Sequence, residues 1–136
     1  MNQQKILIVD DNPVILKTLS MKLASAGYRA ISALDGSEAI SATRKEKPNL
    51  ILLDINFPKD LGVAWDGFKL IAWLQRMEEA ASTPIIVISG GDVAKFQDRA
   101  LEAGAIAYFQ KPIDHVKLIE LIKKTLAENP SEPAQA

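Results

Sequence analysis

The sequence predicts an α/β fold in which a doubly wound, five-stranded parallel sheet lies between two layers of helices. Five short apolar runs alternate with longer segments of helical spacing, a pattern typical of parallel strands covered on both faces. The chain has 136 residues, of which 48% are hydrophobic and 24% charged, as expected for one globular domain. It contains no cysteine, so this core must form without disulfides or thiolate-bound metals.

The first half of the chain supplies three strands and the signals that bound two helices. Strands are predicted over residues 6–9, 28–34 and 50–53. Asn12 and Pro13 begin the first helix as an N-cap and a first-turn proline, and Gly27 ends it. Asp35 and Glu38 have the spacing of a capping box at the start of the second helix. A third helix is expected after a long turn.

The second half completes the alternation with strands predicted over residues 85–88 and 106–109. Asp92 caps the helix between them, Gly104 ends that helix, and Asp114 begins the last one. Residues 128–136 contain two prolines and no periodicity, so we assign 1–127 to the domain and the remainder to a C-terminal tail or linker. Right-handed crossovers then predict a (βα)5 three-layer sandwich of the flavodoxin-like type.

Polar side chains follow four of the five predicted strands: Asp10 and Asp11, Asp54, Ser89, and Lys111. Ligands of open α/β sheets bind beyond the carboxyl ends of the strands, so we expect these groups at one rim. Three neighbouring carboxylates require a compensating cation, and Mg²⁺ (or Mn²⁺) bound beside a phosphoryl group meets that need. Asp54 would be the nucleophile that forms an aspartyl phosphate, with Ser89 and Lys111 stabilising the charge on the phosphoryl oxygens.

Over about residues 5–127 the chain resembles the CheY-like receiver domain of response regulators, the proteins of two-component signal transduction. The resemblance rests on motifs that occur in the family's order: Ile8-Val9-Asp10-Asp11, Leu52-Leu53-Asp54 with Asn56 and Pro58, Ser89-Gly90, and Tyr108 with Lys111-Pro112. It implies a phosphorylation-switched signalling domain, a phosphoprotein that catalyses only its own phosphoryl transfer and dephosphorylation, and not a conventional enzyme.

The resemblance also implies partners and metal ligands. Asp54 would take its phosphoryl group from the histidine of a histidine kinase or a histidine phosphotransfer protein. Asp11 and Asp54 would bind the metal directly, Asp10 would act largely through water, and Asn56 would contribute its backbone carbonyl. The downstream protein target is not implied by any motif.

The remaining motif residues are implied to form the switch. Ser89 would move toward the phosphoryl oxygen, Tyr108 would swing inward into the vacated space, and Lys111 would pair with the phosphate. The resemblance further implies that the peptide bond before Pro112 is cis. The altered surface would lie on the fourth helix, the fifth strand and the fifth helix.

The connection after Asp54 departs from the family pattern, because Asp66 and Gly67 come later than the resemblance implies. The extra residues are partly apolar, and we expect the segment from Pro58 to Asp66 to cover the phosphoryl pocket or to present a surface to one partner. Shortening this segment would then change partner choice or phosphoryl lifetime.

Charge and hydropathy narrow the location and the partners. With 16 basic and 17 acidic residues the net charge is -1, which argues against direct binding of nucleic acid. No apolar run approaches the ~20 residues of a membrane span, so we expect a cytoplasmic protein that does not bind membranes. We expect a monomer or a weak, phosphorylation-dependent dimer.

Three alternatives share parts of this pattern. Mg²⁺-dependent phosphohydrolases with an aspartate nucleophile have an Asp-x-Asp motif after the first strand, but here Asn12 stands two positions after Asp10. A flavin-binding protein needs a Ser/Thr-rich phosphate loop where this chain has two carboxylates that would repel a phosphate. A degenerate receiver would keep the fold and serve only as a protein-interaction module.

Overall fold

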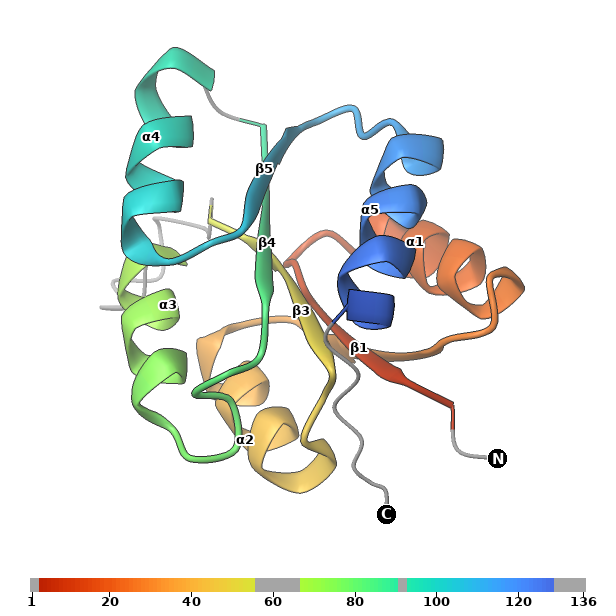
Figure 1. Cartoon of the computed structure of the whole chain (residues 1–136), viewed down its shortest axis with the longest axis horizontal. Coiled ribbons are helices and arrows are strands. Elements are labelled where there is room, and N and C mark those ends of the chain that lie inside the picture. Colours follow the sequence, from red (N-terminus) through yellow and green to blue (C-terminus); the bar gives the residue numbers. More distant parts are fainter. Residues whose placement is uncertain (1–2, 56–66, 91–92, 129–136) are drawn as a thin grey trace.

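The structure is a computed structural model that describes residues 3–55, 67–90 and 93–128, with the side chains of 93, 95 and 128 left out of the description. Its single sheet is parallel, with strand order β2-β1-β3-β4-β5, and it confirms the predicted doubly wound arrangement (Figure 1). The strands are β1 (Lys5–Val9), β2 (Arg29–Ala33), β3 (Leu50–Asp54), β4 (Ile85–Ser89) and β5 (Ala107–Gln110).

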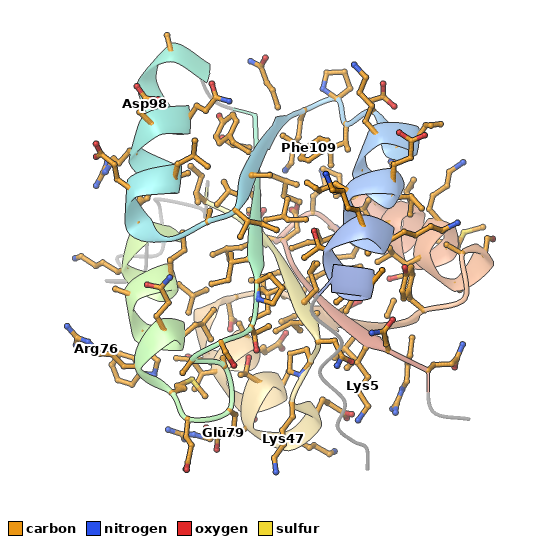
Figure 2. All side chains as sticks on the ribbon, viewed as in Figure 1. Lys5, Lys47, Arg76, Glu79, Asp98 and Phe109 are labelled. Carbon is orange, nitrogen blue, oxygen red and sulfur yellow. The ribbon has the colours of Figure 1, made fainter. Side chains whose placement is uncertain are left out.

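Helices follow all five strands and form the two outer layers: α1 (Pro13–Ser25), α2 (Gly36–Glu46), α3 (Gly67–Arg76), α4 (Val93–Ala103) and α5 (His115–Glu128). Side chains fill the space on both sides of the sheet, whereas Lys47, Arg76 and Glu79 point away from it (Figure 2). No helix in the described ranges is long and apolar enough to span a membrane.

The sheet divides the core into two clusters. In β1, Ile6 and Ile8 pack with the buried leucines of α1 and with α5, whereas Leu7 and Val9 pack with α2, α3 and α4. The alternation follows from the period of two along a strand, which points successive side chains to opposite faces. Every residue of β3 and β4 is buried. Groups on these central strands can therefore meet a ligand only at the rim of the sheet, where the strands end.

The predicted helix caps are found where the structure describes them. The side chain of Asn12 accepts hydrogen bonds from the N–H groups of Val14 and Ile15, at 2.9 and 3.4 Å. The N–H of Glu38 donates to Asp35, while the Glu38 carboxylate accepts the N–H of Leu34, one residue earlier than in a standard capping box. The predicted cap Asp92 lies outside the described residues.

Strand boundaries differ from the predicted ones in an informative way. β3 and β4 continue one residue beyond their apolar runs, because Asp54 pairs with Ile88 and Ser89 with Gln110 in the ladder. Backbone pairing does not depend on side-chain polarity, so hydropathy alone ends these strands too early. Conversely, Ile106 lies before β5 and is 46% exposed, although its hydropathy predicts a strand residue.

Candidate functional site

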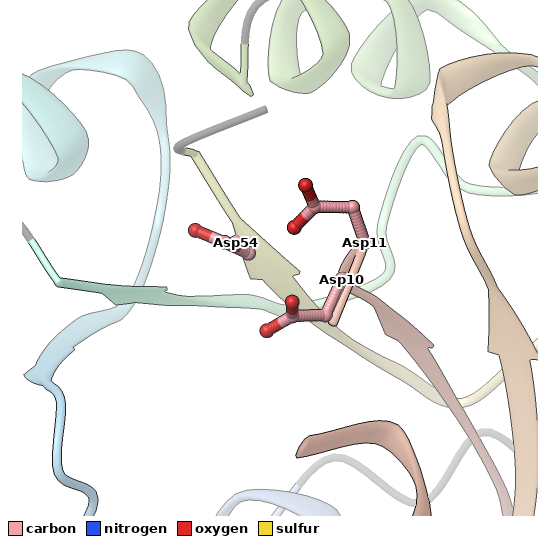
Figure 3. A group of neighbouring side chains, drawn as sticks. All are labelled: Asp10, Asp11 and Asp54. Carbon is pink, nitrogen blue, oxygen red and sulfur yellow. The ribbon is translucent and has the colours of Figure 1, made fainter. Parts of the chain in front are cut away.

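Three carboxylates converge at the carboxyl ends of two neighbouring strands. Asp10 and Asp11 follow β1, and Asp54 ends β3; Val9 is paired with Leu53, so Asp10 lies beside Asp54. Carboxylate oxygens of all three residues lie within 4.8 Å of one another, and Figure 3 shows them pointing toward a common space. Asp10 is 0% exposed and Asp54 2%, whereas Asp11 is exposed.

Lys111 brings a positive charge to the two buried carboxylates. Its Nζ donates to Asp10 Oδ2 at 3.0 Å and to Asp54 Oδ2 at 3.2 Å. The backbone holds the lysine in place, because its N–H donates to the carbonyl of Ser89 at 2.8 Å. The peptide bond between Lys111 and Pro112 is cis. The other oxygen of Asp10 accepts the N–H of Asn12 at 2.9 Å.

The electrostatics keep Lys111 charged. Burial alone would lower the pKa of its ammonium group, but the hydrogen bond to Asp10 and the attraction of both buried carboxylates outweigh that effect. The net result is a raised pKa, so Lys111 remains protonated at neutral pH. In the described part of the site, Lys111 pairs with two of the three clustered carboxylates, which leaves an excess of negative charge.

The other predicted switch residues lie on β4, the neighbour of β3, and on β5, one strand further along the sheet. Ser89 is fully buried at the end of β4, one position beyond the residue paired with Asp54. Tyr108 is half-buried in β5 and packs against the core cluster on the side of α2, α3 and α4. Asn56 and the segment from Pro58 to Asp66 lie outside the described residues, so their predicted roles stay predictions.

A groove beside the site is a feature that sequence reasoning missed. It measures about 450 Å³ and runs between α1 and the connection from β5 to α5. Its lining is Val14, Ile15, Thr18 and Leu19 from α1, Lys111, Pro112 and Ile113 from that connection, and His115 from the start of α5. The available sequence signal was Val14, an apolar residue off the stripe of Leu16, Leu19 and Leu23; in the structure it is 71% exposed.

A family model described as the response regulator receiver domain matches residues 6–123. The chain belongs to this family. The polar-differentiation response regulator DivK of Brucella anthropi is 30% identical over 125 residues, which cover 92% of this chain and 98% of DivK. The protein named probable transcriptional regulator ycf27 of Cyanophora paradoxa is 37% identical over 135 residues, 96% of this chain and 52% of ycf27. The receiver therefore spans about half the length of its ycf27 relatives.

Solved structures agree with the family and the fold. A CheY-like receiver domain protein from Methanospirillum hungatei superimposes with a TM-score of 0.82 at 30% identity, covering 93% of this chain and 96% of that one. The chemotaxis response regulator CheY4 of Vibrio cholerae gives a TM-score of 0.80 at 26% identity, with coverage of 92% and 100%. The resemblance drawn from the sequence motifs is thus confirmed, and the chain is a receiver domain of the two-component class.

Proposed function

We propose that this receiver accepts a phosphoryl group on Asp54 from the phosphohistidine of a kinase or phosphotransfer protein. The observation that carries the proposal is the position of the Asp54 carboxylate. It is 2% exposed, lies 3.2 Å from the ammonium of Lys111, and shares a 4.8 Å cluster with two further acids. Burying a carboxylate among other carboxylates costs free energy, which a solely structural residue would have no reason to incur.

The chemistry follows from the groups around Asp54. A carboxylate oxygen forms a bond to phosphorus, and the phosphorus–nitrogen bond of the phosphohistidine breaks with its electron pair returning to the imidazole. Lys111 stabilises the negative phosphoryl oxygens, and the hydroxyl of Ser89 donates a hydrogen bond to one of them. Moving the phosphoryl group to Asp54 requires Lys111 to redirect part of its interaction from the carboxylates to the new oxygens.

The three acids fit a hard divalent cation such as Mg²⁺, because they offer carboxylate oxygens within 4.8 Å of one another. Asp10, Asp11 and Asp54 would hold the ion, with the backbone carbonyl of Asn56 as a further predicted ligand. When bound, the ion would offset the excess negative charge of the carboxylates and phosphoryl oxygens. The exposure of Asp11 leaves that side of the cluster accessible from solvent.

The groove between α1 and the β5–α5 connection supports docking of the phosphodonor protein at this rim. Lys111 borders both the groove and the acidic site, so a protein seated there would bring its histidine close to Asp54. Val14 lines the groove and is 71% exposed, and Val116, next in sequence to the lining residue His115, is 68% exposed; together they offer apolar surface to a partner helix.

A cytoplasmic location and a monomeric or weakly dimeric state remain predictions.

The hydrogen bonds of Asp10 argue against a phosphohydrolase that uses the first-strand aspartate as nucleophile. One of its oxygens accepts the N–H of Asn12 and the other accepts Lys111, and the side chain is 0% exposed. An acid engaged at both oxygens must give up one of these hydrogen bonds before it can attack a substrate. The motif resemblance, which puts the phosphoacceptor at the end of the third strand, assigns the reaction to Asp54.

Intact-protein mass spectrometry after incubation with acetyl phosphate tests the proposal. We expect one alkali-labile phosphoryl adduct that requires Mg²⁺ and is absent from Asp54→Asn. Asp35→Asn is the matched control, because this exposed helix cap loses a charge but keeps its capping function. An adduct of equal yield on Asp54→Asn, or none on the wild type with either acetyl phosphate or a phosphohistidine protein, would contradict it.

A further inference from the structure

A groove of about 410 Å³ lies between the ends of α2 and α3, on the side of the sheet opposite α1 and α5. Helices that connect parallel strands run back toward the amino ends of those strands, so this groove is at the opposite end of the sheet from Asp54 (Figure 1). Its described lining, called the α2–α3 corner below, is Arg44 from α2, Trp73 and Arg76 from α3, and Met77, Glu78 and Glu79 directly after α3.

The apolar part of the corner has the composition of an interaction surface. Trp73 is 45% exposed and is the largest of the exposed hydrophobic side chains in the described residues. Met77 is 7% exposed and belongs to the core cluster, so the groove has an apolar base that is continuous with the core. Tryptophan, arginine and methionine are enriched at protein interfaces, and tryptophan and arginine contribute most often to the binding energy.

The charges of the corner are balanced and are not used inside the chain. Arg44, Arg76 and Glu78 are exposed, and Glu79 is half-buried. Within the described ranges, none of these four side chains forms an ion pair. Figure 2 shows Arg76 and Glu79 pointing away from the sheet near the end of α3. Two cations and two anions are therefore available to a partner.

A patch that carries both signs of charge can pair with its own copy. In a twofold dimer both chains use the same patch, so each guanidinium group has to find its acid on the same patch of the partner. Two other grooves differ in this respect. The described lining of the groove beside the acidic site carries Lys111 and no acid, and that of a groove along α2 carries Arg44 and Lys45 and no acid.

We propose that the α2–α3 corner is the interface of a weak, twofold-symmetric homodimer. Trp73 of each chain packs into the groove of the other, and Arg44 and Arg76 of each chain pair with Glu78 and Glu79 of the other. The inference is independent of the proposed function. It also differs from the phosphorylation-dependent dimer predicted from the sequence, because its interface lies at the other end of the sheet and forms without phosphorylation.

Sedimentation equilibrium of the unphosphorylated full chain tests the dimer. We expect a monomer–dimer equilibrium between about 10 µM and 1 mM protein in about 50 mM salt, since a small interface binds weakly and salt screens its charges. Trp73→Ala should weaken the dimer about tenfold. Met21→Ala is the matched control and should match the wild type, because it shortens another exposed apolar side chain, 61% exposed on α1.

Charge reversal tests the self-complementarity. Arg44→Glu combined with Arg76→Glu gives a corner with four acids, and Glu78→Arg combined with Glu79→Arg gives one with four cations. Each double variant alone should associate at least about tenfold more weakly, because like charges then face each other. An equimolar mixture of the two should associate again, to within about threefold of the wild type, and this recovery also shows that both variants are folded.

A double variant on α5 controls for attraction between net charges. Lys123→Glu combined with Lys124→Glu changes two exposed lysines and the same net charge as the four-acid variant. It should dimerise like the wild type. When mixed with the four-cation variant it should not restore association to the extent that the four-acid variant does.

Three results would overturn the inference. A monomer at every concentration up to about 1 mM would leave the corner to a different protein. A dimer that Trp73→Ala and both charge reversals leave unchanged would use another surface. Equal recovery with the α5 variant and with the four-acid variant would show attraction between net charges and not pairing at the corner.

Discussion

The two ends of the parallel sheet each carry a cluster of charges, and they differ in burial and balance. At the amino end, Lys5 and Arg29 lie 3.4 and 3.8 Å from the single carboxylate of Glu46, and their side chains are 32% and 54% exposed. Lys5 also donates to the Glu46 backbone carbonyl at the end of α2, where a cation complements the helix dipole. At the carboxyl end, Asp10 and Asp54 are buried and share one lysine.

The difference distinguishes a structural cluster from a functional one. Partly exposed ion pairs contribute about 0–1 kcal/mol each and tolerate change. Buried carboxylates in excess of their cations reduce stability, so under the proposed function the sheet retains them for the chemistry of the site. Paired substitutions at the two ends make this contrast measurable.

The largest contrast is expected from replacing a lysine by methionine at each end. Lys111→Met leaves two buried carboxylates without their shared cation and should lower the free energy of unfolding by about 2–3 kcal/mol, somewhat below the effect for a fully buried pair. Lys5→Met should cost at most about 1 kcal/mol. Urea denaturation without Mg²⁺ measures both, and equal losses would remove the contrast.

Mg²⁺ should stabilise the folded protein only by binding at the carboxyl end of the sheet. A tenfold excess over the dissociation constant should raise the free energy of unfolding of the wild type by about 1.4 kcal/mol. The gain should be lost in Asp11→Asn and unchanged in Glu46→Gln, because only the first removes a carboxylate of the cluster. Thermal unfolding with and without Mg²⁺ tests this, and stabilisation that survives in Asp11→Asn would place the ion elsewhere.

Neutralising one acid at each end of the sheet should change the free energy of unfolding in opposite directions. Asp54→Asn relieves repulsion while Asp10 keeps Lys111 paired, so we expect a stability gain of about 1 kcal/mol without Mg²⁺. Glu46→Gln leaves Lys5 and Arg29 without their acid and should lose up to about 1 kcal/mol. The midpoints of urea unfolding decide the signs, and a loss in Asp54→Asn would show that the cluster is not strained by its charge.

The smallest effect concerns Tyr28, near the amino end. Burial raises the pKa of its phenol, so the unfolded chain ionises first as the pH rises. The stability that this tyrosine contributes is present below its unfolded pKa of about 10 and is lost as the pH passes the folded value. Tyr28→Phe should therefore lose less stability between pH 9 and 11 than the wild type, as equilibrium unfolding across that range would measure. Equal losses of stability in the two proteins would contradict the raised pKa of Tyr28.

Sequence reasoning reached the site because strand ends are encoded locally. Asp10, Asp54 and Lys111 each follow an apolar run, and parallel topology alone brings them to one rim. The sharing of Lys111 between two buried acids was not predictable, since it depends on side-chain conformation and depth.

Contacts between helices were less accessible from the sequence. Phe96, Ala100 and Leu101 in α4 have the spacing of one apolar helix face, but Leu101 is 42% exposed. The contact of Arg99 with Phe68 depends on how α3 and α4 are rotated against each other, which periodicity within one helix does not determine.

The most direct test of the central claim locates the phosphoryl group on the chain. Phosphorylation with Mg²⁺ followed by borohydride reduction converts an aspartyl phosphate to homoserine, which tandem mass spectrometry places at one residue. Homoserine at position 54 alone, dependent on Mg²⁺, is the predicted result. Homoserine at position 10 or 11, or at none, would contradict the assignment of the buried β3 carboxylate as the acceptor.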